Sequence, residues 1–245
     1  MRGLLLALLI GWSLPAVALP KVVHLLSYHS HPPFVTGNGE GETYALAARL
    51  NAVAPPGVRV EVELLPRVRL NQRLSQWLDG RCPGSHCSDN WLVPWVNPKW
   101  GFVPGSGDPY FWVPLADDAN VIVSRRESAV EYHGPESLDG RVLAGIRGHR
   151  YLGIDDRVAA GLVERVDSNV ERDNLLMLLY KRVDAVLLPE STVRYFLSHD
   201  PVLREHADEF YIAAERHQSY RRSLMLPANR DDLLEWVKRA GLAAP

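Results

Sequence analysis

The sequence contains few of the features that mark membrane or nucleic-acid-binding proteins. After the first residues it has no long uncharged apolar run, so no transmembrane helix is expected in the remainder of the chain. The formal net charge of the 245 residues is −2, which gives no electrostatic reason to expect a nucleic acid as a partner. The bulk of the chain is therefore expected to be a soluble protein.

Motifs of common catalytic chemistry are also missing. The sequence has no G-x-S-x-G motif, no P-loop, no G-x-G-x-x-G fingerprint and no zinc signature. Asp117 and Asp118 are adjacent on a stretch expected to be a strand, so their carboxyl groups should point to opposite faces. We therefore expect no enzymatic activity, no cofactor and no bound metal.

The N-terminus has the composition of a secretory signal, residues 1–18. Arg2 precedes an apolar run, and the small residues Ala16 and Ala18 flank Val17 as in an A-x-A cleavage site. The apolar run is short for a membrane span, although an uncleaved anchor is the alternative. We expect a periplasmic mature chain that begins at Leu19.

The only two cysteines, Cys82 and Cys87, lie in the short segment CPGSHC. An exported protein meets an oxidising environment, and the Pro-Gly-Ser stretch between them supplies the turn that a small disulfide loop needs. A Cys82–Cys87 disulfide is therefore expected. The competing interpretation is a metal site that includes His86, but no fourth ligand is apparent and the spacing fits no zinc pattern.

Elsewhere the chain alternates between strand and helix periodicity. Residues 21–28 and 58–66 have the pattern of strands, whereas residues 42–54 and 69–80 carry apolar residues at helical spacing. Later helices are expected over 157–168, 169–182, 191–199 and 230–242, and later strands over 119–126, 183–189 and 221–227. This order predicts an α/β fold in which mixed sheets are flanked by helices.

Residues 81–113 are rich in Pro, Gly and aromatic side chains and have weak periodicity. We expect loops there that pack on the core or line a cleft. Trp91, Trp95 and Trp100 are interpreted as structural. Tyr110 and Trp112 suit either a cleft wall or core packing.

The stretch YHSHPPF, residues 28–34, directly follows the first expected strand. Tyr28 and Phe34 suit either a cleft wall or core packing. His29 and His31 flank one serine, so they point the same way if the backbone is extended. A metal site is one interpretation of the two histidines. Loop histidines at a cleft edge are favoured, because no third ligand is visible.

The order of these motifs resembles bacterial extracellular solute-binding protein family 3, the periplasmic binding domains of amino-acid ABC transporters. The chain shares an exported start, the aromatic–Pro–Phe turn and a helix that ends in Asp-Gly. It also shares an aromatic segment before a crossover strand, DPYFWVPLADDANVIVS. The most specific matches are SLDGRVLAGIRGHRY and NLLMLLYKRVDAVLLPES. The resemblance covers essentially all of residues 21–240.

The resemblance implies a type II periplasmic-binding-protein fold of two α/β lobes joined by two crossover segments. Lobe one would comprise residues 19–116 plus 219–245, and lobe two residues 117–218. A monomer would capture a small polar solute in the interlobe cleft by hinge closure, for an ABC-type transporter. The alternative is a ligand-sensing or orphan binding domain that acts with a separate signalling partner.

The chain departs from the family at the residues that hold an α-amino acid. The segment KWGFVPGSGDPYFW lacks the arginine that family members place before the PY pair. Pro189 and Glu190 stand where an aspartate is usual, and His149 stands where a Ser or Thr is usual. An ordinary α-amino acid is therefore disfavoured as the ligand.

Positively charged residues offer another kind of contact. Arg147 and Arg150 flank a glycine at an expected helix start, which suits an anion, although surface arginines are the alternative. Arg69 could supply charge from lobe one. The candidate ligand contacts are Tyr28, His29, Phe34, Arg69, Tyr110, Trp112, Arg147, His149, Arg150 and Glu190.

Overall fold

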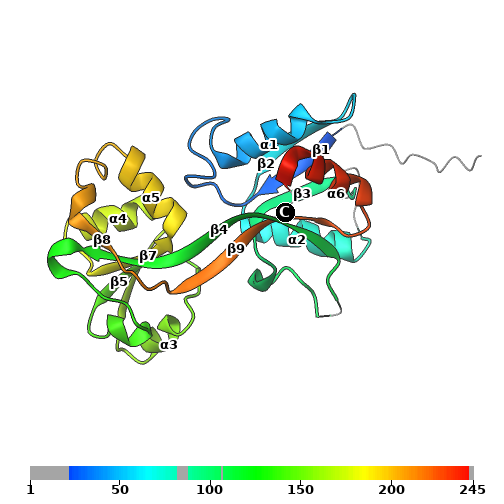
Figure 1. Cartoon of the computed structure of the whole chain (residues 1–245). Coiled ribbons are helices and arrows are strands. Elements are labelled where there is room, and N and C mark those ends of the chain that lie inside the picture. The colour runs from blue at the N-terminus through cyan, green and yellow to red at the C-terminus, as the bar shows by residue number, and fades with distance from the viewer. Residues whose placement is uncertain (1–21, 82–87, 106, 243–245) are drawn as a thin grey trace, which may run out of the picture.

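The computed structural model describes residues 22–81, 88–105 and 107–242. Two groups of helices and strands lie at opposite ends of the molecule and are connected by two long strands (Figure 1). The buried hydrophobic residues form one set from 23–113 and 224–242, and another from 121–213. We call the two groups lobe one and lobe two.

Lobe one contains a sheet with helices on both faces. Its parallel strands are β1 (Val22–Ser27), β2 (Arg59–Leu64) and β3 (Trp91–Val96). Its helices are α1 (Glu42–Ala52), α2 (Arg67–Leu78) and α6 (Asp231–Val237). Leu25 of β1 packs in one cluster with α1 and α6, whereas the next residue, Leu26, packs with α2. This alternation follows from the two-residue period of a strand.

Strand β3 corrects the expectation of loops over residues 81–113. All six of its residues are buried. Pro94 has no N–H to donate to a ladder, and the pairing of β3 with β9 shifts between Val93 and Val96. A strand that is buried on both faces has no polar alternation, so periodicity could not reveal it.

Strands β4 (Tyr110–Arg125) and β9 (Gln218–Pro227) form the antiparallel ribbon that connects the lobes. From Asn120 to Ser124, β4 pairs with β7 of lobe two, so this strand belongs to both lobes. The expected strand over 119–126 therefore begins much earlier, at Tyr110. The lobe boundaries expected near residues 116 and 218 lie along this ribbon and stay predictions.

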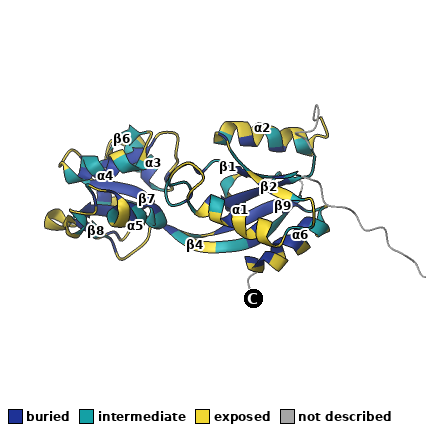
Figure 2. Cartoon of the chain, turned by 90° about the horizontal axis from the view of Figure 1, so that it is seen from above, coloured by how far each residue is buried: buried dark blue, intermediate teal, exposed yellow. Residues whose placement is uncertain are grey.

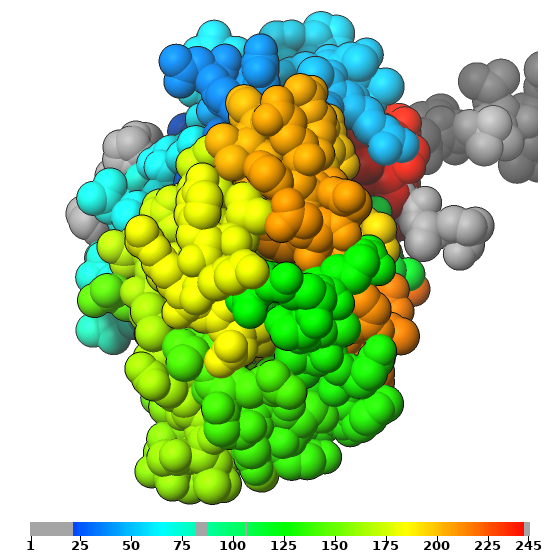
Figure 3. Space-filling model, turned by 90° about the vertical axis from the view of Figure 1, so that its left-hand side faces the viewer, coloured from blue at the N-terminus to red at the C-terminus, as the bar shows by residue number. Residues whose placement is uncertain are grey.

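Lobe two repeats the α/β arrangement. Its strands are β5 (Val142–Ile146), β6 (Glu164–Ser168), β7 (Ala185–Pro189) and β8 (Phe210–Ile212). Its helices are α3 (Ile154–Ala159), α4 (Glu171–Leu179) and α5 (Glu190–His199). Helices α4 and α5 pack in one hydrophobic cluster and α3 in another. Seen from the lobe-two end, green to orange residues cover most of the molecule, with blue and cyan residues of lobe one behind them (Figure 3).

The helix expected over residues 157–168 is wrong in its second half. Helix α3 ends at Ala159, and Gly161 adopts a left-handed φ of 72° that an α-helix cannot continue through. The chain then enters β6. Apolar residues at Leu162 and Val163 had extended the helical pattern beyond its true end.

The strands of both lobes join in one mixed sheet of order β2-β1-β3-β9-β4-β7-β5-β6, with β8 paired to β4. The expected α/β class is therefore confirmed. Buried strands lie beneath helices that expose their outer faces, while the middle of the ribbon is more exposed (Figure 2). Within the described ranges, no helix combines the length and apolar character needed to cross a bilayer.

Candidate ligand site between the two lobes

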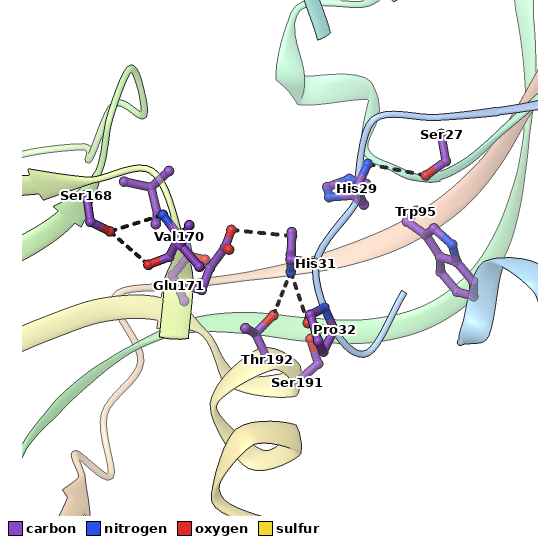
Figure 4. A network of polar contacts seen from close by, with 12 residues as sticks. Ser27, His29, His31, Pro32, Trp95, Ser168, Val170, Glu171, Ser191 and Thr192 are labelled. Atoms are coloured by element: carbon purple, nitrogen blue, oxygen red, sulfur yellow. Dashed lines mark hydrogen bonds and ion pairs between the residues drawn. The ribbon is translucent and has the colours of Figure 1, made fainter. Parts of the chain in front are cut away.

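Strands of both lobes end at the junction between them. In lobe one, β1 ends at Ser27 and leads into the loop of residues 28–34. In lobe two, β6 ends just before α4, and β7 ends at the start of α5. Figure 4 shows the lobe-one loop reaching the first turns of both helices. Ligands of α/β sheets bind outside the carboxyl ends of strands, so this junction is the candidate site.

The 28–34 loop is fixed firmly to lobe one. The His29 backbone N–H donates to Ser27 Oγ at 3.2 Å. Phe34 is 1% exposed, and its ring centroid lies 5.2 Å from that of Trp95. Gly41 approaches the loop so closely that a Cβ there would meet the Phe34 carbonyl oxygen at 2.6 Å. Phe34 therefore anchors the loop in the core, and the histidines extend from this anchor.

His31 is the side chain that links the lobes (Figure 4). Its Nδ1 lies 3.0 Å from the Pro32 carbonyl oxygen and 3.4 Å from Thr192 Oγ1 in the first turn of α5. Its Nε2 lies 3.7 Å from Oε1 of Glu171, the first residue of α4. None of these residues was among the candidate contacts. The two histidines of YHSHPPF were a signal for His31, but nothing local marked Glu171 or Thr192.

His29 lies in an aromatic setting and is 8% exposed. Its ring centroid is 4.1 Å from that of Tyr28 and 5.1 Å from that of Phe34. Burial lowers the pKa of His29 well below 6.5, and the nearby charge of Arg222 lowers it further. Its Nε2 is buried, and a backbone hydrogen bond with Trp95 opposes the lowering of the pKa. Burial in lobe one thus favours the neutral form of this imidazole.

Tyr28 forms a wall together with Arg67 at the start of α2. The guanidinium carbon of Arg67 lies 3.8 Å from the Phe102 ring centroid and 5.0 Å from that of Tyr28. Arg67 also donates to the Tyr28 hydroxyl at 3.2 Å and to the Trp100 carbonyl at 2.7 Å. Burial raises the pKa of Tyr28 above 10, although Arg67 acts in the opposite direction. Arg67 is therefore held in place by packing and hydrogen bonds within lobe one.

The ribbon contributes a buried ion pair to the same region. Arg222 Nε donates to Asp118 Oδ2 at 2.8 Å, and the two side chains are only 3% and 4% exposed. Arg222 also donates to the Trp95 carbonyl at 3.1 Å and to the Tyr220 hydroxyl at 3.3 Å. Its guanidinium carbon lies 4.6 Å from the Phe34 ring centroid. Trp95 itself has a φ of 65°, a conformation that a bulky residue adopts only where its surroundings enforce it.

Asp118 extends this network into lobe two. It accepts hydrogen bonds from the Ser191 backbone N–H at 3.2 Å and from Ser191 Oγ at 2.8 Å. Its neighbour Asp117 is exposed and pairs with Arg221, so the two carboxylates do point to opposite faces. The sequence offered no sign that one of the two aspartates is buried.

Three of the candidate contacts follow β5 in lobe two. Arg147 is exposed, and its guanidinium donates to the Asp167 carbonyl at 3.4 Å. Arg150 is exposed as well. His149 reaches solvent, but neighbouring atoms desolvate its ring enough to lower its pKa, while Glu171 acts in the opposite direction. The Glu171 carboxylate therefore affects the pKa of His149, whereas the two arginines lie at the surface.

Glu190 is engaged within lobe two. Its carboxylate pairs with Arg194 at 2.5 Å and with Arg216 at 2.9 Å. Burial raises the pKa of Glu190, but the hydrogen bonds from both arginines outweigh it and the pKa is lowered overall. Glu190 and Arg216 line an open depression of about 630 Å³ beside the ribbon, together with Tyr220. Its role as a ligand contact stays a prediction.

The three remaining candidates lie in lobe one. Tyr110 packs against Trp77 and Trp91, which is at the beginning of β3 and so at the end opposite the 28–34 loop. Trp112 donates to Asp108 at 2.7 Å. Arg69 is exposed on α2. Packing accounts for the two aromatic residues, and a ligand role for all three stays a prediction.

The expected disulfide and the expected signal segment stay predictions. Cys82 and Cys87 lie outside the described residues, as does the expected signal segment. In the part of the chain that the structure describes, no group of three or more His, Cys, Asp or Glu side chains is arranged to hold a metal ion.

Comparisons with known proteins give a clear result for the fold. No protein-family model and no curated protein matches the sequence. The arginine-bound form of a truncated ArgBP from T. maritima is similar in structure, with a TM-score of 0.59, 20% identity, and coverage of 90% of this chain and 94% of that one. An ancestral arginine-binding protein bound to arginine has a TM-score of 0.60 and 15% identity, over 91% and 92% of the two chains.

A third structure, an arginine 3rd transport system periplasmic binding protein from Legionella pneumophila, has a TM-score of 0.57 and 13% identity, over 91% and 92%. These identities are low, so the likeness concerns the fold. The chain has the two-lobed α/β fold of periplasmic amino-acid-binding proteins, as the sequence resemblance predicted.

Proposed function

We propose that the chain is an exported binding protein that captures a small polar solute between its lobes and passes it to an ABC-type permease. The observation that carries this proposal is the interlobe contact of His31 with Glu171 and Thr192. Side chains from both lobes meet there at the carboxyl ends of strands, where α/β proteins bind ligands.

The ribbon provides a route for closure. Only β4 and β9 run between the two hydrophobic cores in the described chain, so bending at their exposed middle would move one lobe relative to the other. A ligand that touches both lobes would stabilise the closed arrangement, because it binds that state better than the open one. Binding with closure breaks no bond, so the proposal includes no catalytic step.

A thermal-shift screen of residues 19–245 tests the proposal. The panel contains amino acids, polyamines, organic acids, sugars and quaternary ammonium compounds. A ligand at a hundred times its Kd adds about 2.7 kcal/mol, which raises the Tm of a chain of this size by roughly 5–11 °C. A hit should also reduce the radius of gyration in small-angle X-ray scattering. A panel without any hit would count against capture of a small solute.

Two substitutions test the placement of the site. Tyr28→Ala and His31→Ala should each weaken binding of a hit more than tenfold. The exposed residues Tyr180 and His133 of lobe two supply matched controls, Tyr180→Ala and His133→Ala, which should bind normally. Unchanged affinity in both test variants would contradict the proposed location.

A further inference from the structure

His31 Nε2 and Glu171 Oε1 face each other at the junction at 3.7 Å, a separation too long for a direct hydrogen bond. The Pro32 carbonyl can only accept, so the hydrogen of a neutral His31 ring is on Nδ1, 3.0 Å away. The His31 Nε2 lone pair then faces Glu171 Oε1 at 3.7 Å. An external N–H donor placed to one side of the line between them can lie about 2.9 Å from both atoms.

The burial of the His31 ring favours its neutral form. Burial lowers its pKa below 6.5; Glu171 and the Pro32 carbonyl oppose this shift without reversing it. The titratable and charged groups around the ring are Glu171 of α4, Asp118 and Arg222 of the ribbon, His29 of the same loop, and His149 after β5. Arg222 and Asp118 act on the pKa of His31 in opposite directions, and the charged group that faces its Nε2 is the carboxylate of Glu171.

The places that an anion would use are occupied by carboxylates of the protein. At the N-terminus of α5, Asp118 accepts both the backbone N–H and the hydroxyl of Ser191. Helix α4 begins with Glu171, where a helix dipole favours negative charge. A ligand carboxylate would meet repulsion at both helix starts.

We infer that the site takes a small organic cation with several N–H donors, such as a guanidinium or amidinium group, bound by Glu171 and His31. This inference rests on the proposed function. Arg222, the buried cation of the junction, is paired with Asp118, so it offers no free positive charge to a ligand carboxylate. The inferred class therefore differs from an α-amino acid held at both its charged ends.

Isothermal titration calorimetry of residues 19–245 at pH 7.5 tests the inference with four probes. Agmatine carries a guanidinium and no carboxylate, and arginine adds the carboxylate. Tetramethylammonium is a cation without N–H donors, and glutamate is an anion. We expect agmatine to bind at least as tightly as arginine, and both at least tenfold more tightly than tetramethylammonium or glutamate.

Substitutions locate the binding groups. Glu171→Gln should weaken agmatine binding at least tenfold. His31→Phe should have the same effect, and it provides a second test in case the first variant does not fold. Glu164→Gln is the matched control, because Glu164 is exposed at the beginning of β6. Affinity should also fall as the pH drops below about 6.5, since a protonated His31 ring loses its acceptor and repels the cation.

The outcomes separate this inference from the proposed function. If a sugar or a carboxylate binds with closure and agmatine does not, the cation class is wrong and solute capture stands. If agmatine binds normally to both variants, the inference is also wrong. If no compound binds, both proposals fail together.

Discussion

Replacing Asp118 by asparagine should destabilise the protein strongly, although the substitution leaves the packing almost unchanged. The Asp118–Arg222 pair is 4% and 3% exposed, so neither charge is solvated by water. The asparagine side chain would keep the shape and an acceptor for Ser191, but it would leave the Arg222 charge buried without its counterion. Removing one partner of a buried pair typically costs about 3–5 kcal/mol.

The expected change is large enough to measure simply. For a chain of this size, about 3–5 kcal/mol corresponds to a fall in Tm of roughly 6–20 °C. Thermal and urea unfolding, followed by circular dichroism, should agree on the sign and size. The remaining hydrogen bonds of Arg222, to the Trp95 carbonyl and the Tyr220 hydroxyl, do not supply a negative charge.

The adjacent residue offers a matched control. Asp117 makes the same kind of pair with Arg221, but these side chains are 74% and 58% exposed. Water solvates both charges, so Asp117→Asn should leave the Tm unchanged within error. Equal Tm values for the two variants would refute the argument that burial makes the Asp118 pair important.

Three further predictions concern stability. Gly41→Ala should lower the free energy of unfolding by more than about 1 kcal/mol, because the φ of 108° is unfavourable for alanine and its Cβ would meet the Phe34 carbonyl oxygen at 2.6 Å. A urea midpoint equal to that of the wild type would contradict this. Trp236→Ala should lower the free energy of unfolding by about 3–5 kcal/mol, because the side chain is fully buried and donates to the Leu50 carbonyl. The same urea titration measures this change, and a loss below about 1 kcal/mol would show that neighbouring side chains refill the space. Burial lowers the pKa of His29 in the folded state, so the unfolded state binds a proton at a higher pH and the free energy of unfolding should fall as the pH drops below about 6.5. His29→Phe should flatten a plot of Tm against pH between 7.5 and 5, and an unchanged slope would contradict this assignment.

The α/β class and the loop after the first strand were both predictable from local sequence. Residues 22–27 form a strand because their apolar, β-branched pattern suits a buried sheet, and the YHSHPPF loop comes directly after its carboxyl end. Strand β3 escaped prediction because it is buried on both faces and interrupted by Pro94, which removes the alternation that marks a strand.

The site itself depended on pairings between distant residues. His31 and Glu171 are 140 positions apart and Asp118 and Arg222 are 104 apart, so neither pair leaves a local pattern. The sequence by itself determined most of the strands and helices, because periodicity and turn residues act over a few positions; β3 and the end of α3 were the exceptions. Only the tertiary structure decided that Asp118 is buried while Asp117 is exposed, and that His31 reaches the starts of α4 and α5. Burial and charge pairing depend on what the folded chain brings near each side chain, and that information is not local.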